Sequence, residues 1–283
     1  MVDREEQIII EQGNPADSLH SRFISTLGGR EGVRMILEKI CAMLQSCTAA
    51  SSLFPPTVLY NEGWLLRLVL DWFSTHNIPR HPFNFSEDAR WFSEALLPSA
   101  FLRRHKGDPL AESWTHADGV VGHFLIGSEG KADLSLLPAA THFVVLEAKL
   151  HSDLASGVKN ARYFDQAART VACMAEVLSR ANRSPSKVSR LGFYVLAPDS
   201  RIRQGIFVKA MDRGLIQRKV ERRVQEYKGA RDEWHSDWFQ PTLEQIEIEV
   251  ISWEELIAAV RERESAAADI LGGFYEQCLE FNR

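Results

Sequence analysis

The spacing of apolar residues predicts helices in the first third of the chain. Apolar residues recur at helical spacing over residues 18–47, where a pair of glycines divides the stretch into two helices. An amphipathic helix is predicted over 61–73, because its large apolar side chains fall on one stripe. Another helix is predicted over 88–97, with Ser86 as its N-cap.

The pattern then changes from helices to strands. Short apolar or alternating runs separated by turn-compatible residues predict three strands, over 120–126, 132–137 and 143–150. The elements expected after them are a helix over 157–180, a strand over 191–196, a basic helix, a strand over 246–251 and a helix that Ser252 caps. This order predicts an α/β fold with a mixed central β-sheet flanked by helices.

A run of alanine and serine that leads to two prolines is the best linker candidate. We therefore expect an N-terminal helical segment over 1–58 and a larger domain over 59–283. With 45% apolar residues in 283, the chain is neither disordered nor a disulfide-stapled miniprotein. Its four cysteines form no Cys-x-x-Cys pair, and it shows neither a secretory signal nor a membrane-spanning run. These features predict a reduced, cytoplasmic protein without a membrane partner.

Positive charge is concentrated in one segment of a chain whose net charge is −5. Between Ser200 and Arg231, ten lysines and arginines stand against three acids. Such a segment suits a surface that binds a polyanion. The alternative is a solvated helix face, which charge alone favours.

Acidic residues and a lysine mark the ends of two predicted strands. In the run 143–150, four apolar residues lead into Glu147, and Lys149 follows on the same strand face. Asp133 opens the preceding predicted strand, so pairing of the two strands as a hairpin brings Asp133 to Glu147. Two adjacent carboxylates with no His or Cys favour Mg²⁺ or Mn²⁺. The alternative for Glu147 and Lys149 is an ion pair at a strand end.

Two further acids have competing interpretations. Glu62 begins the helix before the sheet and is placed to reach the same carboxylates. It is equally well explained as a first-turn acid that the helix dipole stabilises. Asp118, in the run Thr-His-Ala-Asp-Gly, is interpreted as a turn residue before a strand.

The chain contains, in this order, an acid on a first helix, an Asp, a Glu-x-Lys across a hairpin, a helix and a strand. In this order of features, residues 59–260 resemble the PD-(D/E)XK nuclease superfamily. The resemblance implies a restriction-endonuclease-like core with an N-terminal helical extension. It also implies that Asp133 and Glu147 bind Mg²⁺ or Mn²⁺, that Glu62 supplements them, and that Lys149 orients the attacking water and stabilises charge on the phosphate. Ala132 stands at the position of the family's proline.

The helix after the motif resembles the RecB-like branch in one position. Gln166 matches the first residue of the branch's Gln-x-x-x-Tyr signature, which the resemblance places near the metal, but Thr170 stands at the tyrosine position. Arg169 is a candidate phosphate contact, with an ordinary surface arginine as the alternative. In the basic segment, the candidate nucleic-acid contacts are Arg218, Lys219, Arg222 and Arg223.

We therefore expect a metal-dependent nuclease that hydrolyses phosphodiester bonds, most often in DNA as in the superfamily, with Mg²⁺ or Mn²⁺ as cofactor. The alternative is a catalytically silent PD-(D/E)XK-like module that binds nucleic acid or a protein partner. The intact set of two acids and a lysine favours the enzyme. Strand preference, cleavage mode and oligomeric state stay open, and a homodimer is one alternative.

Overall fold

A computed structural model describes residues 29–49, 52–79, 81–127, 132–157 and 161–283. The chain divides into two units, Met1–Leu59 and Tyr60–Arg283. The first unit contains the helix α2 (Gly29–Gln45) and the 3-10 turn η1 (Pro56–Val58). The other helix that was predicted within 18–47 lies outside the described residues.

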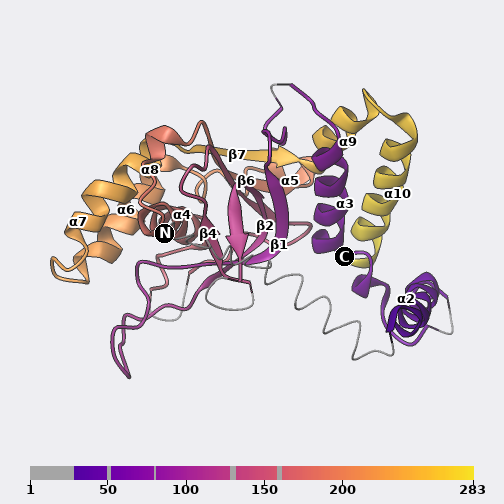
Figure 1. The fold of residues 1–283 in the computed structure, drawn as a ribbon, viewed down its shortest axis with the longest axis horizontal. Coiled ribbons are helices and arrows are strands. Elements are labelled where there is room, and N and C mark those ends of the chain that lie inside the picture. Colours follow the sequence, from indigo (N-terminus) through magenta and orange to yellow (C-terminus); the bar gives the residue numbers. More distant parts are fainter. Residues whose placement is uncertain (1–28, 50–51, 80, 128–131, 158–160) are drawn as a thin grey trace, which may run out of the picture. The chain divides into compact units, whose positions relative to one another are not determined.

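The second unit is built on a mixed sheet with the strand order β1-β2-β5-β6-β7 (Figure 1). The strands span Arg90–Leu97 (β1), Thr115–Gly122 (β2), His142–Ala148 (β5), Arg190–Ala197 (β6) and Glu247–Ser252 (β7). β2 is antiparallel to both β1 and β5, whereas β5, β6 and β7 are parallel. The expected α/β class with a mixed central sheet is confirmed.

Two short strands form a separate hairpin in the connection between β2 and β5. These strands are β3 (Phe124–Ile126) and β4 (Leu134–Leu136), and they pair with each other in an antiparallel arrangement. The hairpin occupies the segment in which a strand over 132–137 was expected. Its pairing differs from the expected one, because β4 does not pair with β5.

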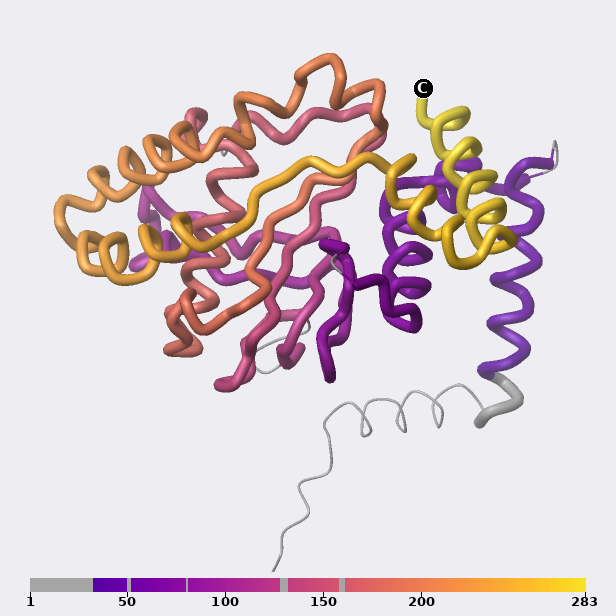
Figure 2. Tube along the Cα trace, turned by 90° about the horizontal axis from the view of Figure 1, so that it is seen from above, coloured from indigo at the N-terminus to yellow at the C-terminus, as the bar shows by residue number. Residues whose placement is uncertain are grey.

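Helices cover both faces of the sheet (Figures 1 and 2). One face packs against α3 (Glu62–Thr75), α9 (Trp253–Arg261) and α10 (Ser265–Phe281). The other face packs against α4 (Gln166–Arg180), α6 (Arg213–Gln225) and α8 (Gln240–Gln245). The remaining helical segments are η2 (Pro185–Lys187), α5 (Asp199–Arg203), α7 (Asp232–Trp234) and a π-helical turn, η3 (His235–Phe239). Within the described part of the chain, no helix is both long and apolar enough to cross a membrane.

Short polar side chains begin the helices that border the candidate site. Asp165 caps α4 by accepting a hydrogen bond from the Ala168 amide at 3.1 Å. Ser252 caps α9 in the same way, at 3.0 Å from the Glu255 amide, as the sequence predicts. These bonds satisfy amides that have no partner inside the helix, so they fix where each helix starts.

The helix that was predicted over 88–97 is wrong, because this segment forms β1. Trp91 and Phe92, which have high strand propensity, pair there with Val121 and Val120 of β2. Ser86, the expected N-cap, instead bonds to His142 Nδ1 at 3.0 Å. Pairing with β2 therefore overrides the helical spacing of these residues.

β5 is the most enclosed strand of the sheet and leads directly to the candidate site. All seven of its residues are buried, because α3 and α4 cover its two faces. Phe143 and Val145 point toward α4, and Val144 and Leu146 point toward α3. This alternation places Glu147 on the α4 side at the carboxyl end of the strand.

We expect Gly192→Ala to destabilise the sheet next to β5. The Tyr194 ring lies against Gly192, so an added Cβ is 2.6 Å from Tyr194 Cε2, and the ring must leave its bond to Glu247. We expect a loss of about 1–3 kcal/mol in the free energy of unfolding, measured by urea denaturation. Gly272→Ala in α10 is the control, because an added Cβ meets nothing within 4 Å and alanine favours helix. Equal stability of the two variants would contradict the prediction.

Candidate active site

Glu147 is a buried carboxylate with two hydrogen-bond donors at one oxygen. Its side chain is 3% exposed, and Lys149 Nζ lies 2.6 Å from its Oε1. Gln166, the first residue of α4, donates from its Nε2 to the same oxygen. The structure therefore brings together three of the residues singled out from the sequence.

Asp118 is the second carboxylate at this place. The β2–β5 pairing aligns Gly119 with Leu146, so the antiparallel register sets Asp118 opposite Glu147. Asp118 Oδ2 accepts a hydrogen bond from the Ala148 amide at 2.8 Å. The interpretation of Asp118 as a turn residue is wrong, because it lies inside β2. Gly119 is a strand residue that leaves space for Leu66 and Leu70 of α3, since an added Cβ would be 3.0 and 3.2 Å from them.

Burial and Asp118 together keep a proton on Glu147. Removal from water, followed by the charge of Asp118, raises the pKa of Glu147 to about 8. The ammonium group of Lys149 acts in the opposite direction. Two carboxyl groups and one ammonium group thus share a site, and the repulsion between the carboxylates opposes the ionisation of both acids at once.

Lys149 is held by its backbone as well as by its ion pair. Its amide donates to Leu196 O of β6 at 2.8 Å, and its carbonyl accepts from Trp253 Nε1 at 2.9 Å. Trp253 begins α9 and is fully buried. The lysine side chain is 12% exposed. The ammonium group is therefore a fixed charge beside Glu147, with a narrow access to solvent.

The strand on the other side of Asp118 is irregular. Glu94 lies between the β1–β2 pairs of Ser93 with Gly119 and of Ala95 with Ala117, so it opposes Asp118. Its φ is +61°, a left-handed conformation that costs energy for a non-glycine residue. A strained backbone beside a pair of carboxylates is a feature typical of functional sites.

Gln166 connects the carboxylates to the segment before α4. While its Nε2 donates to Glu147, its Oε1 accepts from the Ala155 amide at 3.0 Å. The capping bond of Asp165 fixes the first turn of α4 and hence the position of Gln166. The amide side chain therefore has both ends occupied and a defined orientation.

The expectation that Asp133 meets Glu147 is wrong. Asp133 forms a bridge with Leu96 of β1, whose amide donates to Ala132 O at 2.7 Å. Both β1 and β2 thus lie between Asp133 and β5, and three strand spacings amount to roughly 14 Å. Asp133 is buried beside β1 rather than beside the metal-ligand candidates. The strand before β5 in the sequence does not pair with it, because β4 pairs with β3 while β2 takes the place beside β5.

Glu62 begins α3, on the sheet face opposite to the side chain of Glu147. Its charge acts on Cys278 of α10, where burial first and Glu62 second raise the pKa of the thiol to about 12. The structure therefore associates Glu62 with α10 and does not place it beside the two carboxylates.

Three of the four predicted nucleic-acid contacts in α6 reach the surface. Arg218 and Arg222 are exposed, and the Arg222 guanidinium lies 3.8 Å from the centroid of the Tyr163 ring. Lys219 Nζ pairs with Asp165 Oδ2 at 2.6 Å, next to Gln166. Arg169, in α4, has its Nε buried without a hydrogen-bond partner among the described residues. Burial raises the pKa of Glu112, and the charge of Arg169 is one of those that oppose this rise, so this arginine faces inward.

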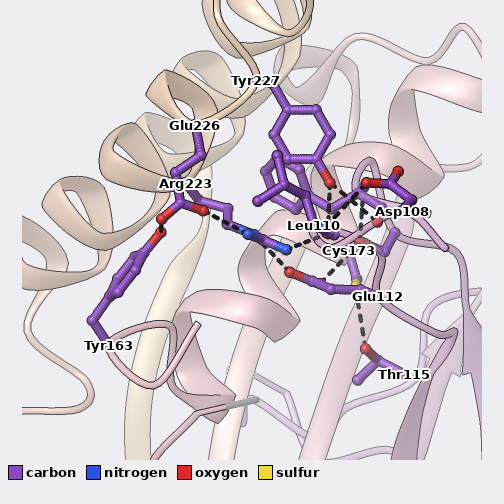
Figure 3. A network of polar contacts seen from close by, with 11 residues as sticks. Asp108, Leu110, Glu112, Thr115, Tyr163, Cys173, Arg223, Glu226 and Tyr227 are labelled. Carbon is purple, nitrogen blue, oxygen red and sulfur yellow. Dashed lines mark hydrogen bonds and ion pairs between the residues drawn. The ribbon is translucent and has the colours of Figure 1, made fainter. Parts of the chain in front are cut away.

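Arg223 is not a nucleic-acid contact, because its side chain is 0% exposed. Figure 3 shows it inside a network that joins α6 to the segment between β1 and β2. Its Nε donates to Glu112 Oε1 at 2.9 Å and its Nη1 to Glu226 Oε2 at 2.6 Å. Its Nη2 donates to the Leu110 carbonyl at 2.5 Å. The prediction is wrong since helical periodicity turns this arginine inward together with buried Val224, although Arg222 just before it is exposed.

The same network reaches the segment before α4. Tyr163 donates its hydroxyl hydrogen to Glu226 Oε1 at 2.6 Å, and Tyr227 donates to the Leu110 carbonyl at 2.8 Å (Figure 3). Burial, followed by the bond to Glu226, raises the pKa of Tyr163. Arg223 and its partners therefore hold α6 at a fixed place relative to Asp165 and Gln166.

We expect the stability of the metal-free protein to fall as pH rises from about 4.5 to about 8. In this window the folded protein keeps a proton on Glu147 that the unfolded chain releases, so unfolding becomes easier with rising pH. Glu147 contributes a slope of order 1 kcal/mol per pH unit to the free energy of unfolding. Urea denaturation in EDTA at several pH values measures it. Glu147→Gln should flatten the slope, and Glu276→Gln, an exposed change in α10, should leave it as in the wild type.

A second prediction concerns Arg223. Arg223→Met leaves Glu112 buried without its cation, so we expect a loss of about 3–5 kcal/mol in the free energy of unfolding. Arg222→Met, at the adjacent exposed position, removes only a surface cation–π contact and should cost about 0.5–1 kcal/mol. Urea denaturation of both variants decides the point. Similar losses at the two positions would mean that Arg223 is not the buried anchor described above.

No protein-family model matches this chain, and no curated protein or solved structure shows significant similarity to it. The assignment of a function to the two carboxylates therefore depends on their geometry and chemistry.

Proposed function

We propose that this protein is a divalent-metal-dependent nuclease that hydrolyses phosphodiester bonds in DNA. The observation that carries the proposal is the meeting of Asp118 and Glu147 at the carboxyl end of β5, with Lys149 and Gln166 bonded to Glu147. The order α3, β1, β2, β5, α4, β6 also resembles the core implied by the PD-(D/E)XK resemblance. In this arrangement Asp118 takes the role that the sequence had suggested for Asp133.

The residues present fit a hard divalent cation such as Mg²⁺ or Mn²⁺. Asp118 and Glu147 supply carboxylate oxygens, and their proximity is costly unless a proton or a cation compensates it. The described residues contain no cluster of three or more His, Cys, Asp or Glu side chains suited to a metal. Two carboxylates are nonetheless sufficient for Mg²⁺, which keeps several waters and takes further oxygens from a phosphate. A bound cation would lower the pKa of a water and neutralise phosphate charge.

The protein's own residues have separate tasks in this proposal. Lys149 holds a compact positive charge where negative charge develops on the attacked phosphate, and its backbone bonds to Leu196 and Trp253 keep it in place. Gln166 orients the Glu147 carboxylate by donating to one of its oxygens. Glu147 must lose its proton before it can act as a ligand, so metal binding is expected to release a proton.

The exposed cations of α6 support nucleic acid as the substrate. Arg218, Lys219 and Arg222 lie on the helix that the Arg223 network fixes near Gln166. Contacts of this kind bind phosphates without reading sequence, and they weaken with added salt. Lys219 is one ion pair away from Asp165, which caps α4 next to the proposed cleavage site, and this supports the proposal.

A catalytically silent module that binds nucleic acid or a protein is the second candidate function. The observation in its favour is that Lys149 and Gln166 already satisfy Glu147 without a metal. The two candidates differ in metal binding, because a silent module does not require Asp118 and Glu147 to bind a cation.

The assignment of Asp118 is tested by calorimetric titration of Mn²⁺ into single variants. We expect Asp118→Asn and Glu147→Gln to abolish binding, since each removes one of the two carboxylates. Asp133→Asn and Glu62→Gln should retain it, because these acids lie elsewhere. Retained binding in Asp118→Asn, or lost binding in a folded Asp133→Asn, would contradict the site.

Cleavage assays on linear, circular and single-stranded DNA and on RNA complete the test. In Mg²⁺ we expect Asp118→Asn and Glu147→Gln to be inactive. Lys149→Arg should lose roughly 10²–10³ in rate while it still binds Mn²⁺, because the guanidinium is larger and places its charge elsewhere. Mn²⁺ binding by the wild type without cleavage of any of these substrates would favour the silent module.

A further inference from the structure

A pocket of about 360 Å³ opens beside the candidate site, and the nuclease assignment does not use it. We call it the α5–α6 pocket, because its walls come from the segment between α5 and α6, from α6 itself and from two segments before α4. Its lining includes five apolar residues and two lysines: Leu154, Ile206, Phe207, Ala210, Leu215, Lys209 and Lys219.

The pocket and the carboxylates share two stretches of backbone. Asp165 lines the pocket, and the next residue is Gln166, which binds Glu147. Leu154 and Ser156 line the pocket, and the amide of Ala155 between them donates to Gln166 Oε1 at 3.0 Å. The pocket therefore directly borders Gln166, the residue that donates to Glu147.

The charges around the pocket favour an anion at its rim. Both acids of the lining are already in ion pairs: Asp153 with Arg201 at 2.5 Å and Asp165 with Lys219 at 2.6 Å. Lys209 is exposed and has no acidic partner in the part of the chain that the structure describes. The rim thus carries unbalanced positive charge, while Leu154 and Phe207 make the interior apolar.

A nucleotide has this combination of chemistry, with an apolar flat base and an anionic phosphate. The base suits the interior, where an ion would lose its hydration without a partner. The phosphate suits the ammonium group of Lys209 at the rim. A base that is stacked and paired within a duplex cannot enter a pocket, so the base that fits here is unpaired.

We propose that the α5–α6 pocket holds one unpaired base next to the phosphodiester that is cleaved, so the substrate is single-stranded at that position. This inference depends on the proposed nuclease function and adds to it the class of substrate.

Binding without cleavage tests the pocket directly. Fluorescence anisotropy in EDTA measures the affinity of the wild-type protein for a series of short labelled DNA strands, each with one abasic site at a successive position. We expect the loss of a single base to weaken binding roughly tenfold or more. This weakening of binding should occur when the missing base is at one particular position of the strand, or at either of two adjacent positions. A series in which no position stands out overturns the proposal.

Filling the pocket provides a second test. Ala210→Phe places a ring where the base would lie, so the variant should bind all strands like the weakest abasic one and show no preferred position. Val208→Phe is the matched control, because Val208 is 68% exposed and does not line the pocket. Circular dichroism establishes that both variants are folded. If Ala210→Phe keeps the wild-type pattern of affinities, the proposal is wrong; if it fails to fold, the wild-type abasic series decides.

Cleavage distinguishes failure of this inference from failure of the proposed function. If the wild type cleaves blunt duplex in Mg²⁺ as fast as single strands, the pocket proposal is overturned and the nuclease assignment stands. If the wild type neither binds nor cleaves any nucleic acid, both proposals are overturned. Preferred cleavage of single strands that Ala210→Phe reduces and Val208→Phe preserves supports both.

Discussion

The repulsion between Asp118 and Glu147 is the constraint on which the site depends. Two carboxyl groups at the end of a buried strand cannot both be charged without a nearby cation. The metal-free protein meets this requirement with a proton on Glu147, the ammonium group of Lys149 and the amide of Gln166. The strands, the start of α4 and the bond from Trp253 all serve to hold these groups in contact.

Different layers of the fold contribute different parts of the candidate site. The sheet supplies both carboxylates and the lysine, and α4 supplies the orienting amide. The long connection between β6 and β7 supplies α6 with its exposed cations and two walls of the α5–α6 pocket. Arg223 joins this connection to the rest of the unit. The carboxylates are positioned by the pairing of the strands, and Lys219 links α6 to them through its ion pair with Asp165, the residue before Gln166.

Local patterns were sufficient for some residues and insufficient for others. Glu147 and Lys149 end an apolar run and Gln166 begins a helix, so each carries its signal within a few positions. Asp118 is recognised only from the register of β2 against β5, which no local pattern contains. The sequence offers only a weak indication of Asp118, which stands just before an apolar run, whereas Glu147 stands at the end of one. The residues next to Arg223 in the sequence would suit an exposed arginine equally well, so only the tertiary packing reveals that it is buried.

The network around Arg223 also has a consequence for how the chain reaches its folded state. Arg223 follows Glu112 by 111 residues and Leu110 by 113, so the contact closes a long loop. Closing long loops early is entropically expensive, and contacts of this kind slow folding. During synthesis Glu112 emerges well before its cation, so this ion pair can form only once α6 has been made. The anchor of the segment between β1 and β2 therefore depends on a helix that is synthesised after both strands that carry the carboxylates.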